Sequence, residues 1–238
     1  MEIKNFETSK LAKEGGNKLT EFLRAKENKA VLLLLTGGSA MEMFEFVKPE
    51  VLGTHITMTI LDERFSEDPK VCNFLRLKTL PFYERAVEAD VSIFDTSLKV
   101  GETMGELVAR FETMLREWRD ENPRGAVIST FGIGEDGHIC GIMPHPENPQ
   151  KFSELFENDS HWVVGYDAGL KTQFPLRVTT TFSFLRKNLT AGIAYLSGEK
   201  KRAALKSLLA PRGALAETPA RILNELPNMT LFTDIFMS

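Results

Sequence analysis

The sequence predicts an α/β fold, a three-layer sandwich with a mostly parallel central sheet. Short apolar runs bounded by glycine recur along the chain, as is typical of strands buried on both faces. Segments with apolar residues at helical spacing alternate with these runs, which favours helices on both sides of the sheet. The 238 residues fit one large domain, and no repeat, linker or low-complexity segment divides them, so we expect a single domain over 1–238.

In the N-terminal half, apolar runs and helical patterns alternate, and proline residues end several of the helical patterns. This alternation predicts consecutive strand–helix–strand units. The expected elements are, in order, a helix over 6–26, a strand over 30–35, a helix over 40–47, a strand over 56–61 with a polar loop through 69, a helix over 73–80, a strand over 91–94 and a helix over 101–121.

The C-terminal half opens on what we expect to be the central strand. It begins at Val127 and runs into a loop that holds four glycines, two acids and one histidine before Pro144. The elements expected after it are a polar, irregular surface segment over 147–158, an edge strand over 162–164, a strand over 176–180, a helical turn over 182–186, a strand over 191–196, a helix over 199–209, a short helix over 219–223 and a last strand over 229–232.

Composition narrows the classes of partner. A net charge of -4 gives no reason to expect a nucleic-acid or membrane partner, although a local group of basic residues can still bind a small anion. The N-terminus has no apolar signal-peptide core, and the longest apolar run is too short to cross a bilayer, so we expect a cytoplasmic protein. Cys72 and Cys140 have no zinc-like spacing, so we expect reduced thiols and no metal site.

Polar residues follow the first two expected strands. Thr36, Gly37, Gly38 and Ser39 follow the strand over 30–35, and two interpretations stay open: an anion-binding loop in which Ser39 contacts a phosphate, or a plain turn with Ser39 as the helix N-cap. No Walker lysine follows, which excludes a P-loop nucleoside triphosphatase.

Asp62, Glu63 and Arg64 follow the strand over 56–61. They are either a solvated loop or a functional group at the same carboxyl edge of the sheet, in which Arg64 is a bidentate clamp for a phosphate or carboxylate.

The loop after the central strand holds the candidate chemical centre, His138, whose side chain has an unperturbed pKa suited to proton transfer near neutral pH. The alternative is a structural histidine with two loop hydrogen bonds. The spacing of Gly132, Gly134 and Gly137 matches the dinucleotide fingerprint, but no helix pattern begins at its end, so we reject a dinucleotide site. Asp136 either orients the imidazole or is a turn residue.

A fourth group pairs Arg177, on the strand over 176–180, with the lysines that open the helix over 199–209. Arg177 and Lys201, with Lys200 as a substitute, can converge on an anion at the edge of the sheet. The alternative is that the lysines form a solvated helix face.

Taken together, these segments resemble the glucosamine-6-phosphate isomerase/6-phosphogluconolactonase family over nearly the whole chain. The most specific segment is Gly-x-Gly-x-Asp-Gly-His, from Gly132 to His138. The family's order is followed by Leu35 to Ser39, Asp62 to Arg64 with Asn73, Phe131 to His138 with Pro144, Pro175 to Thr179, Ser197 to Lys201, and Thr218 to Asp234.

The resemblance is to the lactonase branch of that family. Deaminases carry a catalytic glutamate five positions after the histidine, where this chain has Met143; Arg64 and Pro144 fit the lactonases. The chain departs from the lactonase pattern in the loop over 139–143, at Ala40-Met41 and at Cys72, which reshapes the expected pocket wall.

The resemblance implies a modified Rossmann-like fold and hydrolysis of 6-phospho-D-glucono-1,5-lactone, with no cofactor, a phosphorylated sugar lactone as ligand, and a monomer or homodimer. The alternatives are a glucosamine-6-phosphate deaminase/isomerase and a non-catalytic sugar-phosphate-binding protein. His138 would be the general base, Asp136 its orienting carboxylate and Arg64 a ligand of the oxyanion or the phosphate. The implied substrate- and phosphate-binding residues are Thr36, Gly37, Gly38, Ser39, Asp62, Gly137, Arg177 and Lys201.

Overall fold

The computed structural model describes residues 1–237 and is organised around a seven-stranded sheet in which all neighbouring strands are parallel. β6 lies in its centre, as the sequence predicts. The strand order is β1 (Glu2–Asn5), β10 (Met229–Thr233), β9 (Leu189–Leu196), β6 (Ala126–Gly132), β2 (Val31–Leu35), β3 (Ile56–Ile60) and β5 (Ser92–Ile93).

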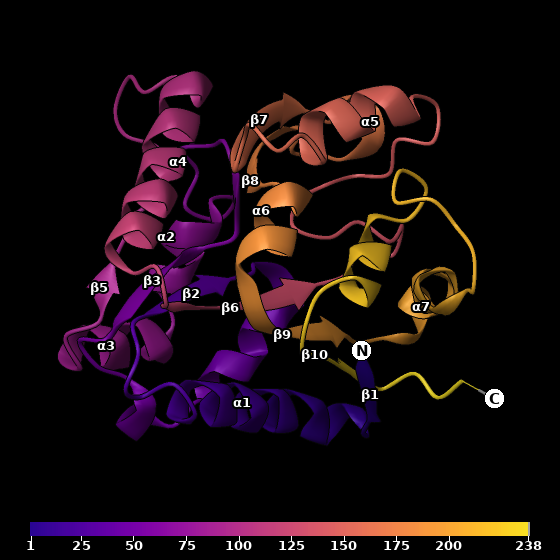
Figure 1. The fold of residues 1–238 in the computed structure, drawn as a ribbon. Helices are drawn as coiled ribbons and strands as arrows, with labels where there is room; N and C mark the ends of the chain where they lie inside the picture. Colours follow the sequence, from indigo (N-terminus) through magenta and orange to yellow (C-terminus); the bar gives the residue numbers. More distant parts are fainter. Residues whose placement is uncertain (238) are drawn as a thin grey trace.

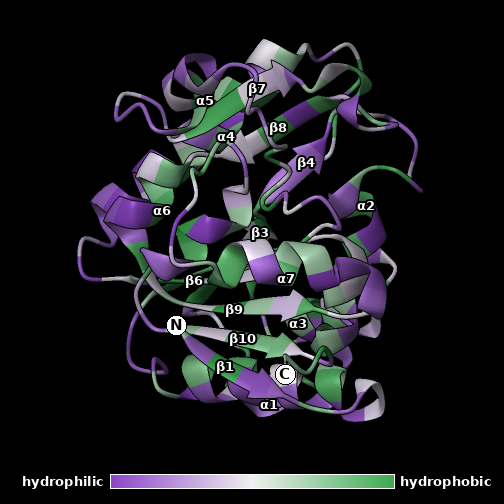
Figure 2. Cartoon of the chain, turned by 90° about the vertical axis from the view of Figure 1, so that its right-hand side faces the viewer, coloured by the Kyte–Doolittle hydropathy of each residue, from purple (hydrophilic) through white to green (hydrophobic). Residues whose placement is uncertain are grey.

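Helices cover both faces of this sheet, which confirms the predicted three layers (Figure 1). Strand β2 shows why: Leu33 belongs to one buried apolar cluster, whereas Leu32 and Leu34 belong to another on the opposite face. In Figure 2, β9 and β10 lie between α1 below and α7 above. One face packs against α1 (Thr8–Arg24), the 3₁₀-helix η1 (Gly38–Phe46), α2 (Asn73–Lys78) and α3 (Pro81–Glu88), and the other against α4 (Met104–Glu121), α6 (Phe182–Asn188) and α7 (Arg202–Leu209).

A second, antiparallel sheet of three strands was not predicted. Its order is β4 (Asp62–Arg64), β8 (Leu176–Thr180) and β7 (Val163–Asp167). The expected loop over 62–64 is therefore a strand, because its backbone pairs with β8 although its side chains are charged. The strand over 176–180 exists, but it lies in this small sheet.

Other elements differ from the expectation as well. The segment expected to be irregular contains α5 (Pro149–Phe156), whose N-cap Asn148 accepts a hydrogen bond from Lys151 N and whose Phe152 and Phe156 are buried one turn apart. Strand β1 and helix α3 were not predicted. The remaining short elements are the 3₁₀-helices η2 (Pro49–Val51), η3 (Gly169–Lys171), η4 (Glu199–Lys201) and η5 (Pro219–Asn224).

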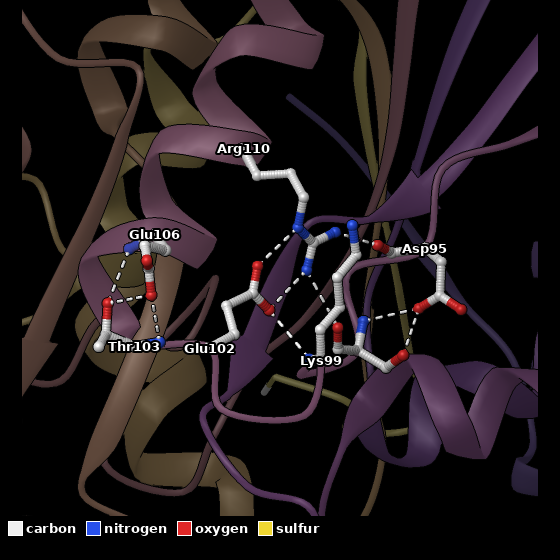
Figure 3. Close-up of polar contacts among 7 residues, drawn as sticks. Asp95, Lys99, Glu102, Thr103, Glu106 and Arg110 are labelled. Carbon is white, nitrogen blue, oxygen red and sulfur yellow. Dashed lines mark hydrogen bonds and ion pairs between the residues drawn. The ribbon is translucent and has the colours of Figure 1, made fainter.

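The segment between β5 and α4 is fixed to that helix by Arg110 (Figure 3). Its guanidinium group forms a bidentate ion pair with Glu102 at 2.7 and 2.9 Å and donates to the carbonyl oxygens of Asp95 and Ser97. Thr103 and Glu106 form a capping box at the start of the helix. These contacts fix the segment before α4 to the first half of that helix.

The chain order places one crevice at the carboxyl edge of the large sheet. From β2 the chain continues to β3 on one side, whereas β6, the neighbour of β2 on the other side, is followed by β9 further out. The loops that leave β2 and β6 therefore diverge, and ligands of open α/β sheets bind at such a point. None of the described helices is long and apolar enough to cross a membrane.

Candidate active site

A pocket of about 290 Å³ opens at this divergence. It brings together nine of the residues singled out from the sequence, and two others, Asp136 and Gly137, stand outside its lining. The nine are Thr36, Gly37, Gly38, Ser39, Asp62, Arg64, His138, Arg177 and Lys201.

Threonine hydroxyls brace the two loops that form the pocket floor. The backbone N–H of Thr36 donates to Oγ1 of Thr130 at 3.0 Å, and the N–H of Gly132 donates to Oγ1 of Thr36 at 3.2 Å. The N-cap of η1 is Gly37 and carries no side-chain cap bond, so the interpretation of Ser39 as the N-cap is wrong. Ser39 is instead an exposed hydroxyl at the pocket rim.

The imidazole of His138 is held by Asp136. Nδ1 of His138 lies 2.6 Å from Oδ1 of Asp136, and the backbone N–H of His138 donates to the same oxygen at 3.1 Å. Because the carboxylate accepts from Nδ1, the Nδ1–H tautomer is favoured and Nε2 keeps its lone pair. Burial raises the pKa of Asp136, but the hydrogen bonds and charge of His138 outweigh it, so the net pKa is lowered.

Glycines let the ring lie close to its own loop. A Cβ atom at Gly134 would stand 2.1 Å from Nδ1 of His138, so the ring packs on this glycine. Gly137 has φ +81, a conformation that favours glycine, and its missing side chain would meet Thr218 at 2.9 Å. Gly137 therefore shapes the turn and does not line the pocket.

Arg64 and Arg177 are directly opposite each other on β4 and β8, so their side chains share one face of the small sheet. Arg177 is 5% exposed, and among the described residues neither guanidinium forms an ion pair. The Nε atom of each is buried without a hydrogen-bond partner. Burial lowers the pKa of Arg177, Asp62 opposes this and Arg64 adds to it. An anion bound between Arg64 and Arg177 would offset their mutual repulsion and give the buried guanidinium groups a charged partner.

Asp62 is a buried carboxyl group beside these arginines. It is 6% exposed, and burial raises its pKa. The charges of Arg177, Arg64 and His138 lower the pKa, but by less than burial raises it. A Cβ atom at Gly141 would stand 2.7 Å from its Oδ2, and Gly141 has φ +64, so only glycine lets the loop pass this close.

Lys201 supplies a third basic group, at the start of α7. It is half-buried, and burial lowers its pKa. The charges of Glu135, Asp234 and Glu42 raise the pKa, but by less than burial lowers it. Lys200 is exposed and lies outside the pocket lining. The structure thus separates the two lysines, and only Lys200 matches the solvated helix face.

Two further residues at this site, Glu63 and Asn73, belong to segments named in the sequence analysis but were given no role of their own there. Glu63 is 1% exposed, and its carboxylate accepts from the backbone N–H groups of Arg64, Asn73 and Phe74 at 2.8, 2.5 and 2.9 Å. Burial raises its pKa to about 7, and the three amides offset part of that rise. Asn73 lines the pocket, and its Nδ2 donates to the carbonyl oxygen of Asp62. A buried carboxylate that caps α2 therefore sets the position of Asn73.

Within residues 1–237, no group of three or more histidine, cysteine or acidic side chains is arranged to hold a metal ion. Cys72 and Cys140 are buried free thiols, and burial raises the pKa of both. The pocket instead contains an imidazole that a carboxylate orients, three cationic side chains and a buried carboxyl group. These are His138 with Asp136, then Arg64, Arg177 and Lys201, and finally Asp62. This set can accept a proton and bind an anion.

Comparison with known proteins gives a family match over residues 7–231, to the family described as glucosamine-6-phosphate isomerases/6-phosphogluconolactonase. A curated 6-phosphogluconolactonase from Borreliella burgdorferi is 30% identical over 104 residues. That match spans 43% of this chain and 40% of the relative, so less than half of the relative's length is covered.

Solved structures of both activities share the fold. A 6-phosphogluconolactonase from Shewanella baltica superposes with a TM-score of 0.75 at 20% identity, covering 98% of this chain and 96% of that chain. A monomeric glucosamine-6-phosphate deaminase superposes with a TM-score of 0.73 at 17% identity, covering 98% of this chain and 97% of that chain. At these identities the likeness shows the fold alone.

Proposed function

This chain belongs to the family of glucosamine-6-phosphate isomerases and 6-phosphogluconolactonases, and on that premise we propose that it hydrolyses 6-phospho-D-glucono-1,5-lactone to 6-phosphogluconate in the oxidative pentose phosphate pathway. One observation carries the proposal: His138, held by Asp136, shares a pocket with Arg64 and Arg177, whose charges no ion pair among the described residues neutralises. A base beside an anion site suits hydrolysis of a phosphorylated ester.

In the proposed reaction His138 acts as general base and then as general acid. Nε2 takes a proton from water while the water oxygen forms a bond to the lactone carbonyl carbon, and the carbonyl electron pair moves to oxygen. When this tetrahedral intermediate collapses, the bond between the carbonyl carbon and the ring oxygen breaks. The imidazolium then returns its proton to the ring oxygen. Asp136 keeps Nδ1 protonated throughout, as its 2.6 Å contact allows.

The basic groups divide between the phosphate and the oxyanion. We assign Arg177, Lys201 and Ser39 to the phosphate, together with the backbone of Thr36, Gly37 and Gly38. Arg64 stabilises the oxyanion or binds the phosphate. Either role is within its reach because it lies directly across from Arg177. Asp62 contributes a buried carboxyl group to the wall opposite Gly141. No cofactor takes part in this scheme.

The deaminase alternative lacks a specific observation in its favour. The position at which the resemblance puts the deaminase glutamate is Met143, an apolar side chain that is 2% exposed. Its backbone N–H donates to the hydroxyl of Tyr166 at 3.0 Å, and that hydroxyl donates to the carbonyl oxygen of Gly141. These hydrogen bonds fix the backbone at Met143. Because the side chain at this position is a methionine, it supplies no carboxylate to the pocket.

A coupled assay tests the proposal directly. Lactone hydrolysis is followed through 6-phosphogluconate dehydrogenase, with the spontaneous rate subtracted, and ammonia release from glucosamine 6-phosphate is measured in parallel. We expect lactone hydrolysis above background and no ammonia. Ammonia release would replace the proposal with the deaminase. Binding of 6-phosphogluconate without turnover would replace it with a sugar-phosphate-binding protein.

We also propose that the enzyme is cytoplasmic, that 1–238 is one domain, and that it acts as a monomer or homodimer without nucleic-acid or membrane partners. Light scattering during gel filtration separates the two oligomeric states.

A further inference from the structure

The loop between β7 and β8 lies outside the lining of the pocket but contacts both of its arginines. Its base is closed by a hydrogen bond from Ala168 N to Pro175 O at 2.9 Å. From its tip, Oγ1 of Thr172 accepts a hydrogen bond from Nη2 of Arg177 at 3.1 Å, and the ring of Phe174 lies 5.5 Å from the guanidinium carbon of Arg64. Both arginines of the anion site are therefore touched by one short stretch, residues 172–174.

Lys171, the residue before this stretch, joins it to the loop that carries His138. Its Nζ lies 2.8 Å from the carbonyl oxygen of Pro144, 2.8 Å from Nδ1 of His145 and 2.5 Å from Oε1 of Glu147. Among the described residues, these are the hydrogen bonds and ion pair that connect the two loops. A cavity of about 270 Å³ lies between the loops, lined by Lys171, Thr172 and His138 among others.

The acceptors of Lys171 stand outside the pocket in which the substrate is proposed to bind. Neither His145 nor Glu147 lines that pocket, and neither does Lys171 itself. Nδ1 of His145 accepts only when it is unprotonated. Burial and the charges of Lys171 and Lys151 lower the pKa of His145 against the opposing charge of Glu147, which keeps the ring neutral. The ammonium group is thus directed at loop acceptors.

We propose that Lys171 is a positioning residue: by bonding Pro144, His145 and Glu147, it holds residues 172–174 against Arg64 and Arg177 and so fixes the two guanidinium groups for the substrate's phosphate. This inference rests on the proposed function, because it takes the arginine pair as the phosphate site. Without the bonds of Lys171, the loop tip loses its attachment to the His138 loop, and the guanidinium groups are left with more rotamers to lose on binding.

The test compares Lys171→Met, His145→Phe and the double variant with wild type, using inorganic phosphate and 6-phosphogluconate as calorimetric ligands and the phosphorylated lactone as substrate. We expect Lys171→Met to weaken phosphate binding and raise KM about 10-fold, with kcat changed less than about 2-fold. His145→Phe should raise KM by a smaller factor. In the double variant the effects should not add, since both substitutions break one contact.

Leu170→Ala is the matched control, because Leu170 is the neighbour of Lys171 and its side chain is fully exposed; its KM should equal that of wild type. Equal KM in wild type and Lys171→Met overturns the inference. So does a large effect of Lys171→Met that is fully additive with His145→Phe, because a direct phosphate ligand would behave in that way. Thermal unfolding of each variant identifies any that fail to fold, and in that case Lys171→Gln is measured instead. Phosphate binding by wild type without lactone hydrolysis would remove the proposed function and leave this inference intact.

Discussion

Arg64 and Arg177 face each other across the β4–β8 ladder, and each has a buried Nε without a hydrogen-bond partner. Two like charges at opposing positions of an antiparallel pair destabilise a sheet, and an anionic ligand bound between them would offset that cost.

The first prediction separates the roles of these arginines. Arg177→Met should raise KM for the phosphorylated lactone about 10- to 100-fold, as expected for loss of a charge-assisted hydrogen bond, and should leave kcat nearly unchanged. An unphosphorylated gluconolactone is the control, and its hydrolysis should change little. Equal losses with both lactones would exclude Arg177 as a phosphate ligand. For Arg64→Met, a fall in kcat would assign Arg64 to the oxyanion, and a rise in KM alone would assign it to the phosphate.

The second prediction concerns the proposed base. His138→Gln should lower kcat about 100- to 10,000-fold, the usual contribution of general acid–base catalysis. The side chain of His138 is 35% exposed, so the free energy of unfolding should change little. Steady-state kinetics and thermal unfolding measure the two quantities. A variant with the wild-type rate would remove His138 from the mechanism.

The third prediction uses the glycine beneath the imidazole. In Gly134→Ala the new Cβ would stand 2.1 Å from Cε1 and Nδ1 of His138 and 2.8 Å from Oδ1 of Asp136, so the imidazole and its carboxylate partner must both shift. A misplacement on the order of 1 Å costs about 100-fold in rate, and we expect a loss of kcat near that size. Gly105→Ala is the control, because a Cβ there meets nothing within 4 Å. If both variants keep full activity, the position of the ring does not limit catalysis.

The sequence predicted the large sheet well because strands buried on both faces leave a plain signal. β2 is apolar at all five positions, and β6 and β9 are buried at nearly every position, with Ser129, Thr130 and Thr190 as their polar residues. β4 was missed because Asp62, Glu63 and Arg64 read as a solvated loop. Their strand exists through backbone pairing with β8, and a local pattern carries no information about such a distant partner.

The candidate site was predicted residue by residue, but its arrangement was not. His138, Arg64 and Arg177 were selected from their chemistry at strand ends, whereas the pairing of the two arginines depends on a sheet that the sequence did not reveal. The contact of Lys171 with Glu147 joins two loops whose relative position only packing determines. Glu63 was named with Asp62 and Arg64 but given no role of its own, because a run of charges does not reveal which carboxylate accepts the three backbone N–H groups.

The fourth prediction concerns the stability contributed by Glu63. Its folded pKa is about 7, against an ordinary value of 4.5, so between these pH values the unfolded chain has released a proton that the folded chain retains. The free energy of unfolding should therefore fall as the pH rises through this range, by about 3 kcal/mol in total from this group.

Glu63→Gln cannot ionise and lacks that fall. The difference in unfolding free energy between Glu63→Gln and wild type should thus move by about 3 kcal/mol in favour of the variant from pH 4.5 to 7. Urea unfolding at a series of pH values measures it. Most other carboxylates titrate alike in both proteins and cancel, and the titratable groups coupled to Glu63, which are Asp62, Cys72 and Arg177, differ only through that coupling. A difference that stays constant across this range would mean that Glu63 is ionised in the folded protein, held by its three backbone donors alone.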